Sequence, residues 1–419
     1  MIIHDVRIEN AEPASDIRIE DGRFKEIAPV GTLLAADGEQ VVEGAGHLLL
    51  PPFVDPHVHL DSAFTAGEPE WNESGTLFDG IRIWSMRKQA LTVEEAQERA
   101  VRALWLMASH GTQFVRSHVD VTDPDLVALR ALVEVREEVK DVVELQLVAF
   151  PQEGILSFPD GRRLMERAID AGADVVGGIP HYEFTRDYGV ESIHFLMDLA
   201  SANDKLVDVH CDEIDDPASR FLETLATDAL ETGMADRVTA SHTTAMGSYN
   251  DAYTYKLFRL LRMSGINFVS NPLVNMHLGG RFDTYPKRRG LTRVKELDAE
   301  GINVAFGEDD LRDPWSPLGT GNMMDVVYMG VYAAQLMGYR QLQDAYRFVT
   351  TNGAKTLHVT DHYGIEVGKA ASFVILDAPD FYTALNTHAP VLLSMREGRT
   401  LMERTPAKTV KEVMIPAHS

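Results

Sequence analysis

The chain has 419 residues, of which 45% are hydrophobic and 25% are charged, and its formal net charge is -25. This length suits one large barrel with a small additional domain. The acidic charge argues against a nucleic-acid partner, because neutralising phosphates requires clustered Lys and Arg. The single cysteine, Cys211, excludes an internal disulfide and a cysteine-rich zinc site.

The N-terminal segment has neither the basic region nor the apolar region of a signal peptide. No apolar run approaches the roughly 20 residues that cross a bilayer. A single cysteine also fits a reducing compartment. We therefore expect a cytoplasmic protein with no membrane partner.

Both ends of the chain have the alternating pattern of β-strands. Residues 2–8 and 16–19 alternate, Asp21-Gly22 is a hairpin signal, and residues 24–27 resume the alternation. Residues 371–377 and 391–395 have the same character near the other end. We expect the two termini to form one small β-sandwich domain, made of residues 1–52 and 361–419.

The long middle segment, residues 53–360, alternates apolar strand runs with helical patterns, for example at residues 92–110 and 221–232. Continuous apolar strands separated by helices indicate a buried parallel sheet, and eight units favour an α/β fold of the closed (β/α)8 TIM barrel type. An open dinucleotide-binding sheet is disfavoured, because no glycine-rich phosphate motif follows the first strand. The eight strand runs are at residues 53–61, 114–119, 145–150, 175–179, 206–210, 238–242, 266–270 and 302–306.

The first of these strands carries the pattern His57-Val58-His59. Side chains two apart on a strand share a face, so the two imidazoles converge and form a natural pair of metal ligands. The same pattern is equally compatible with two structural histidines at a strand end. Ligands from elsewhere in the chain are needed to decide between the two.

Other strand ends carry the polar side chains that such a site needs. The active site of a (β/α)8 barrel lies at the carboxyl ends of its strands. A lone histidine there is more often structural, but polar groups at five strand ends together predict one functional site. Besides the first strand, the polar ends are Gln152 and Glu153, His210 to Glu213, His242, and Glu308 to Asp310.

Longer motifs are spread over nearly the whole chain. They are PHVHLD at 56–61, NESGTLF at 72–78, VAFPQEGIL at 148–156, DVHCDEIDD at 208–216, ASHTTAM at 240–246, GRFDTYP at 280–286 and DDLRDPW at 309–315. On these motifs the chain resembles the amidohydrolase superfamily and, within it, the bacterial cytosine deaminases.

The resemblance implies four metal ligands, His57, His59, His210 and Asp309. Three imidazoles and one carboxylate suit one divalent cation, Zn²⁺ or Fe²⁺, with an open position for water. Binuclear relatives in this superfamily use a carboxylated lysine on the fourth strand. Here that strand end reads Gly178-Ile179-Pro180-His181 without a lysine, so we expect a single metal, and His181 is either a pocket residue or a structural one.

The catalytic roles also follow from the resemblance. His242 would orient the attacking water, and Asp309 would accept its proton in addition to binding the metal. Glu213 would protonate the ring nitrogen of the substrate, where attack on the ring carbon places negative charge. A homo-oligomer is implied as well.

The implied substrate-binding residues are Gln152, Asp310 and Trp315. Gln152 suits the amide-like edge of a pyrimidine, and Trp315 either walls the pocket or packs in the core. Two positions depart from the cytosine deaminase pattern, Glu308 in place of a histidine and Phe64 in place of a more polar residue. Glu308 should point away from the metal, because neighbours on a strand face opposite ways, and Phe64 either reshapes the pocket or belongs to the core.

The predicted activity is hydrolytic release of ammonia from a small heterocyclic base, cytosine or a closely related free aminopyrimidine. Isocytosine, 5-methylcytosine, isoguanine, creatinine and amino-triazines are alternatives. Ring opening of a cyclic amide is disfavoured by the missing lysine, and a non-catalytic barrel by the complete set of implied site residues. The other zinc deaminase fold is excluded, because its Pro-Cys-x-x-Cys motif needs two cysteines.

Overall fold

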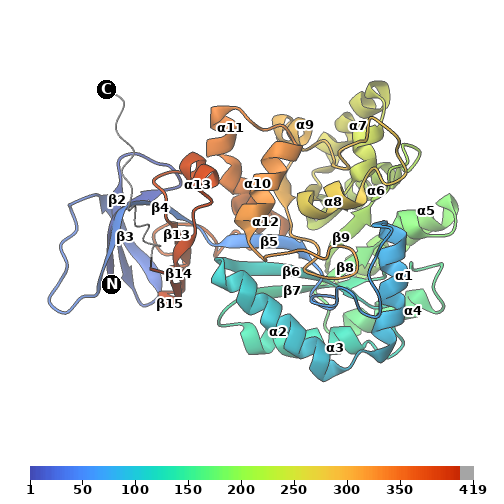
Figure 1. Ribbon diagram of the computed structural model, residues 1–419, viewed down its shortest axis with the longest axis horizontal. Helices are drawn as coiled ribbons and strands as arrows, with labels where there is room; N and C mark the ends of the chain where they lie inside the picture. The colour runs from blue at the N-terminus through green and yellow to red at the C-terminus, as the bar shows by residue number, and fades with distance from the viewer. Residues whose placement is uncertain (406–419) are drawn as a thin grey trace, which may run out of the picture.

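The computed structural model describes residues 1–405 of the chain. It contains an eight-stranded barrel surrounded by helices and a separate seven-stranded sheet built from the two ends of the chain (Figure 1). The predicted α/β fold, a (β/α)8 TIM barrel with a small β domain formed by the termini, is confirmed.

The barrel strands lie where the sequence predicts them. They pair in parallel and in sequence order, each with the next strand along the chain. Their bounds are β5 Phe53–Val58, β6 Thr112–Asp120, β7 Glu144–Phe150, β8 Val175–Gly178, β9 Leu206–Cys211, β10 Val238–His242, β11 Asn267–Ser270 and β12 Val304–Phe306.

The barrel closes at the strand ends that carry the first and last candidate ligands. Val58 forms a parallel bridge with Asp309. The His59 backbone N–H donates to the Asp309 carbonyl at 2.8 Å, and the Asp309 N–H donates to the His57 carbonyl at 2.8 Å. The backbone hydrogen bonds of closure therefore hold the three candidate ligands His57, His59 and Asp309 in a fixed arrangement.

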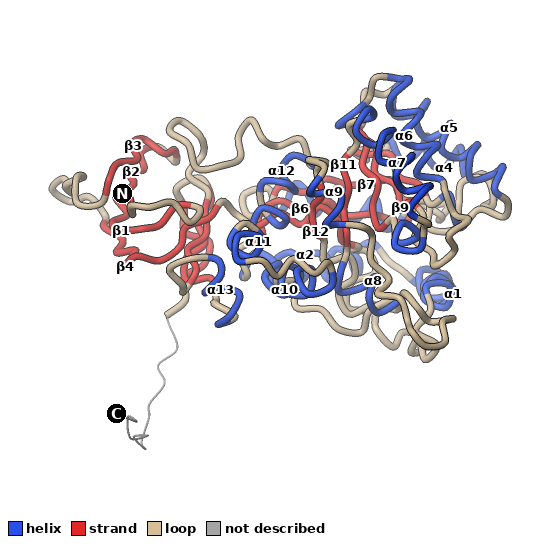
Figure 2. The backbone as a smooth tube through the Cα atoms, turned by 90° about the horizontal axis from the view of Figure 1, so that it is seen from above, coloured by secondary structure: helices blue, strands red, loops and turns tan. Residues whose placement is uncertain are grey.

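Helices cover the outside of the barrel, as Figure 2 shows. Thr92 caps α2 by accepting from Glu95 N, and α6 ends at Gly233 in the left-handed region, both of which follow common helix-end signals. No helix within residues 1–405 is long and apolar enough to cross a membrane. The α-helices are α1 Leu77–Arg87, α2 Val93–Ser109, α3 Val127–Val139, α4 Gly161–Asp170, α5 Arg186–Ala202, α6 Phe221–Thr232, α7 Asp251–Ser264, α8 Pro272–Leu278, α9 Val294–Ala299, α10 Met323–Ala333, α11 Tyr339–Gln343, α12 Thr351–Thr356 and α13 Phe381–Thr387. The 3-10 helices are η1 Lys88–Ala90, η2 Pro180–Tyr182, η3 Ala235–Arg237, η4 Thr244–Ser248 and η5 Ala345–Val349.

The small domain is one sheet that bends over its own core, where the sequence analysis expected a sandwich. Its strand order is β15-β14-β13-β4-β1-β2-β3. Phe24 on β3 and Phe373 on β13 would be about 19 Å apart in a flat sheet, but their ring centroids are 6.2 Å apart. The bend thus encloses an apolar core as a sandwich does. The strands are β1 Ile2–Ile8, β2 Ser15–Glu20, β3 Arg23–Pro29, β4 Val41–Leu50, β13 Phe373–Leu376, β14 Val391–Arg396 and β15 Arg399–Glu403.

This sheet packs against the amino ends of the barrel strands (Figures 1 and 2). Gln113, early in β6, donates to the Met395 carbonyl at 2.9 Å. Close by, a Cβ on Gly111 would lie 2.7 Å from the side chain of Val374. The carboxyl ends of the barrel strands are therefore free to form a site on the opposite side.

Candidate active site

Four buried side chains meet at the carboxyl ends of β5, β9 and β12. His59 Nε2 lies 3.1 Å from His210 Nε2. Asp309 Oδ1 lies 3.3 Å from His57 Nε2 and 3.6 Å from His59 Nε2. One ligand atom from each of the four residues lies within 4.8 Å of the others. The structure therefore brings together the complete ligand set implied by the sequence.

These separations fit one shared cation. Ligand atoms about 2.1 Å from one ion, at angles of about 90–120°, are roughly 3.0–3.6 Å apart. His57 Nε2 and Asp309 Oδ2 are buried, and neither has a hydrogen-bond partner within the described residues. Because buried polar atoms are normally satisfied, these orphaned atoms and the His-rich donor set together indicate a metal site.

The protonation states of the imidazoles also suit metal binding. Burial lowers the pKa of His57, His59 and His210 well below the usual value. Each ring is therefore neutral at physiological pH and keeps a lone pair for a cation. Burial raises the pKa of Asp309, so a nearby positive charge is what would hold this carboxylate ionised.

A buried hydrogen-bonded chain fixes the orientation of His57. Ser241 Oγ donates to Asp208 Oδ1 at 2.6 Å and lies 3.0 Å from His57 Nδ1. Because the hydroxyl proton is used on Asp208, His57 Nδ1 must be the donor to Ser241, which leaves the lone pair on Nε2. Arg116 Nη1 donates to Asp208 Oδ2 at 2.9 Å and neutralises the buried carboxylate. Such outer partners orient metal-binding histidines.

The Ser241→Ala variant is expected to bind its metal about 10- to 100-fold more weakly, because His57 loses the partner that fixes its tautomer and orientation. Competition with a chelator of known affinity measures the change. Ser270→Ala is the matched control, since Ser270 is equally buried at a neighbouring strand end and its hydroxyl has no partner within the described chain. Equal weakening in both variants would contradict this role of Ser241.

Two other groups in the described part of the chain bring three possible ligands together, and each shares a histidine with the first site. The group of His57, His118 and Asp208 is disfavoured, because Arg116 and Ser241 already occupy both oxygens of Asp208. The group of His210, Glu213 and His242 is disfavoured because it has only three members and His210 already belongs to the four-residue group. The geometry therefore supports a single metal site.

His242 and Glu213 lie beside this site as an acid–base pair. His242 ends β10, and its Nδ1 lies 3.3 Å from Glu213 Oε1 and 3.7 Å from Asp309 Oδ2. Asn275 Nδ2 lies 2.9 Å from the same ring nitrogen and helps to orient the ring. Burial raises the pKa of Glu213 to about 8, so this carboxyl carries a proton at neutral pH and can donate it.

A small cavity of about 10 Å³ lies against the metal-binding group. It contains the three residues expected to bind substrate, together with Glu213 and three of the four ligands. Trp315 was expected to be either a wall of the pocket or a core residue, and it is both. It lines this cavity and packs against Ile81 and Trp84. The lining residues are His59, Leu77, Gln152, His210, Glu213, Leu278, Asp309, Asp310 and Trp315.

Asp310 is paired with a second carboxyl group, that of Asp313. Burial, and then the nearby Asp313 carboxyl, raise the pKa of Asp310 well above its usual value. Asp313 is itself held by Ser62 Oγ, which donates to its Oδ2 at 2.8 Å, and by the backbone N–H of Trp315 at 2.9 Å. This shift favours the protonated form of Asp310, in which the carboxyl group can act as a hydrogen-bond donor.

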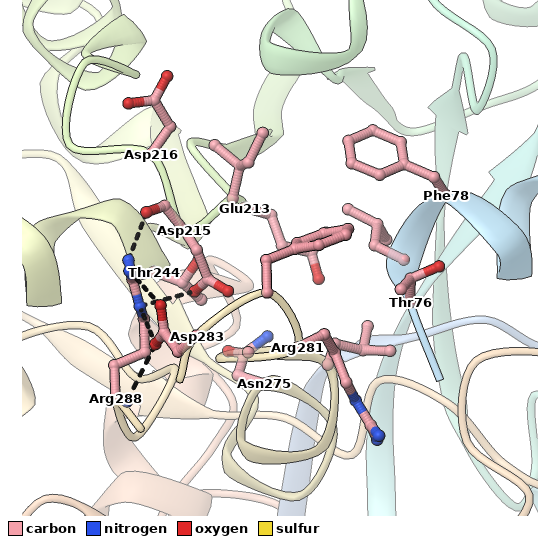
Figure 3. Close-up of a pocket in the computed structure, with 15 residues that line it drawn as sticks. Thr76, Phe78, Glu213, Asp215, Asp216, Thr244, Asn275, Arg281, Asp283 and Arg288 are labelled. Atoms are coloured by element: carbon pink, nitrogen blue, oxygen red, sulfur yellow. Dashed lines mark hydrogen bonds and ion pairs between the residues drawn. The ribbon is translucent and has the colours of Figure 1, made fainter. Parts of the chain in front are cut away.

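A larger outer chamber of about 290 Å³ adjoins the inner cavity, and Figure 3 shows the residues that line this chamber. The two spaces share the side chains of Leu77, Glu213 and Leu278. In Figure 3 Phe78, on α1, lies on one side of the chamber, and the cluster of Asp215, Asp283 and Arg288 lies on the other. A ligand would pass this chamber before it reaches Glu213.

The two departures from the cytosine deaminase pattern lie outside the cavities. Glu308 points away from the ligands, as predicted, and accepts from the Gly321 backbone N–H at 3.2 Å. Phe64 lies between the guanidinium groups of Arg102 and Arg312, 4.2 and 5.6 Å from its ring centroid. Of the two alternatives for Phe64, the structure favours packing over a change in pocket shape.

Sequence reasoning missed several partners of the ligands. His118, on β6, stacks on His57 with ring centroids 3.9 Å apart. The alternation along β6 could have predicted this position of His118, because Arg116, His118 and Asp120 share one face of the strand. Asn271 and Asn275 also contact His242. Asn271 precedes the short helix α8 and Asn275 lies within it, and no pattern in the sequence predicts these contacts. His181 is in η2, and burial lowers its pKa to about 3.

A closed barrel with three buried histidines and an aspartate grouped at its carboxyl end suits a metal-dependent hydrolase. Residues 40–402 match the model of the amidohydrolase family, and the chain belongs to this family. It is therefore an amidohydrolase-type enzyme.

Two curated relatives and one solved structure illustrate the similarity. The crystal structure of 5-methylcytosine deaminase from Klebsiella pneumoniae, liganded with 5-fluorocytosine, is 52% identical, with a TM-score of 0.95 and complete coverage of both chains. N-isopropylammelide isopropyl amidohydrolase from Pseudomonas sp. (strain ADP) is 29% identical, over 96% of this chain and 97% of the relative. Pterin deaminase from Rhizobium rhizogenes is 28% identical, over 94% of this chain and 89% of the relative.

Proposed function

We propose that this protein is a metal-dependent hydrolytic deaminase of cytosine or a closely related free aminopyrimidine, with 5-methylcytosine among its substrates. The observation that carries the proposal is the Glu213 carboxyl, 3.3 Å from His242, in a cavity that three of the four candidate metal ligands also line. The 52% identity to a 5-methylcytosine deaminase, over the complete chain, supports the same substrate class.

The proposed metal ligands are His57, His59, His210 and Asp309. A divalent metal held there would lower the pKa of a water molecule toward neutrality and so supply a nucleophile at physiological pH. We propose Zn²⁺ or Fe²⁺, because three imidazoles and one carboxylate suit either ion.

The proposed catalytic residues are Glu213, His242 and Asp309. His242 orients the water, and the free oxygen of Asp309 accepts its proton. Glu213 protonates the ring nitrogen next to the carbon under attack, then takes the proton of the newly added hydroxyl group and passes it to the exocyclic amine. The proton held by Asp309 afterwards restores the acid form of Glu213. A C–O bond forms, the C–N bond to that amine breaks, and ammonia leaves.

The proposed substrate-binding residues recognise the edges and the face of the base. Gln152 offers a donor and an acceptor to the amide-like edge, and protonated Asp310 offers a further donor. The indole of Trp315, whose centroid is 6.2 Å from that of His59, provides an apolar wall for a flat ring.

Further parts of the proposal concern the whole protein. We propose a homo-oligomer located in the cytoplasm, with a small heterocyclic base as its substrate and with no nucleic-acid or membrane partner. We also propose that residues 53–360 form the catalytic barrel, and residues 1–52 and 361–419 the small domain; residues 406–419 of that last segment lie outside the described residues.

Ammonia release from a panel of bases tests the function. Cytosine and 5-methylcytosine are expected to be deaminated with the highest kcat/KM, and isocytosine, isoguanine, creatinine, amino-triazines and a pterin with lower values. Activity confined to an amino-triazine would replace the pyrimidine by the substrate class of the 29% identical relative. Release of ammonia from none of them would contradict the proposal.

A further inference from the structure

A narrow-necked loop borders the entrance to the active site. This loop, residues 279–290, follows α8 and is called the flap below. Its ends meet at Gly279 and Gly290, where a Cβ on Gly279 would lie 2.5 Å from the Gly290 Cα. Gly280 and Gly290 both have a φ of +71°, which side-chain-bearing residues rarely adopt. The neck of the flap therefore requires glycine.

The flap exposes two large aromatic side chains that differ in position. Phe282 is 79% exposed and Tyr285 is 89% exposed. Phe282 lines the outer chamber together with Leu77, Phe78 and Glu213, whereas Tyr285 is not among the residues lining it. An exposed apolar side chain at the wall of a chamber is a natural contact for a ligand.

The flap is also connected to the segment that carries Glu213. The Gly280 N–H donates to Asp215 Oδ2 at 2.7 Å. Arg288 makes a bidentate pair with Asp283, with both distances 2.7 Å, and its Nη1 donates to the Asp215 carbonyl. Figure 3 shows this cluster beside the chamber. Asp215 is two residues from Glu213, so the flap and the proposed acid are held by one network.

We propose that Phe282 is a substrate-binding residue of the flap, which stacks on the face of the bound base and closes the passage from the outer chamber to Glu213. This inference rests on the proposed function, since it requires a planar aromatic base as ligand. Leu77 and Leu278, which line both spaces, provide the apolar surroundings for such a stack. The stack contributes binding energy and keeps bulk water from the reacting carbon.

Closure of the flap would also limit the size of the base that the enzyme can accept. A monocyclic base bound beside Glu213 would lie under the Phe282 ring, whereas a bicyclic base such as isoguanine or a pterin would extend into the space that this ring occupies. Removing the ring should therefore favour bicyclic bases relative to pyrimidines. Phe282 would then act as a residue that determines specificity.

The test compares Phe282→Ala with Tyr285→Ala, an equally exposed aromatic position on the same flap. With the best pyrimidine substrate of the wild-type enzyme, Phe282→Ala is expected to raise KM and lower kcat/KM about 10- to 100-fold. Phe282→Tyr should restore most of the loss, because it keeps a stacking ring. Tyr285→Ala should differ from wild type by less than about 2-fold, and the ratio of isoguanine to pyrimidine turnover should rise only in Phe282→Ala.

Metal content and molar mass in solution are measured for each variant. Unchanged kinetics of Phe282→Ala would overturn the inference, as would equal losses in both alanine variants. A loss of activity accompanied by a lower molar mass would also overturn it, because Phe282 would then serve contacts between subunits. The proposed function is judged separately, from the wild-type enzyme alone: if it deaminates a pyrimidine and the Phe282 variants behave as wild type, only the flap inference fails.

Discussion

Replacing His210 with Asn is expected to lower kcat about 10³-fold or more and to remove most of the bound metal. The His210 ring is one of four ligands, and its Nε2 lies only 3.1 Å from the Nε2 of His59. The variant would leave three ligands and weaken both cation binding and the stabilisation of charge in the transition state, which is worth several kcal/mol. Metal analysis of the purified protein and a steady-state assay measure the two effects.

His194→Asn is the matched control for this variant. His194 is exposed on α5 and pairs with Asp228 at 2.7 Å, outside both active-site cavities. Its replacement should leave the metal content at about one ion per chain and leave kcat unchanged. Full activity of His210→Asn with a normal metal content would contradict the proposed ligand set.

The second large effect is expected for Glu213→Gln, with a kcat about 10²- to 10⁴-fold lower and an unchanged metal content. The amide keeps the size of the side chain and its place beside His242 but cannot transfer the proton to the ring nitrogen. Ammonia release and metal content are measured together. Because Glu213 is not a proposed ligand, loss of the metal in this variant would contradict the division of roles.

The pH profile of kcat follows from the same residue. Burial raises the pKa of Glu213 to about 8, so the acid form that donates a proton predominates below that pH and is lost above it. Activity should therefore fall as the pH rises through about 8. The residual activity of Glu213→Gln should not fall in this way above pH 8. The same fall in the variant would show that another group causes it.

The barrel and its polar strand ends could be predicted because their signals are local, whereas the set of four candidate ligands followed from the resemblance to the amidohydrolases. A continuous apolar run of five or six residues is enough to predict a buried strand, and the polar residue at its end marks the active side of the barrel. His57, His59, His210 and Asp309 each occupy such a place. Barrel closure then converts four separate positions in the sequence into one group, within 4.8 Å.

Other features of the fold and the site could not be predicted, because they depend on contacts between segments that are distant in the sequence. The bend of the small sheet brings Phe24 to Phe373 across a long interval of chain, and no local pattern distinguishes a bent sheet from a sandwich. Asn275 reaches His242 only because α8 follows β11 in the barrel. The position of Phe282 likewise depends on the network that joins Arg288 to Asp215, which the motif at 280–286 does not reveal.

The reaction of the metal-loaded enzyme with 5-methylcytosine in ¹⁸O-labelled water distinguishes deamination from ring opening. Each molecule of base is expected to lose one ammonia and gain one labelled oxygen, so that labelled thymine and ammonia form in equal amounts. Mass spectrometry of the product and an ammonia assay measure both. A product that has gained a whole water molecule without releasing ammonia would identify a ring-opening hydrolase and contradict the account.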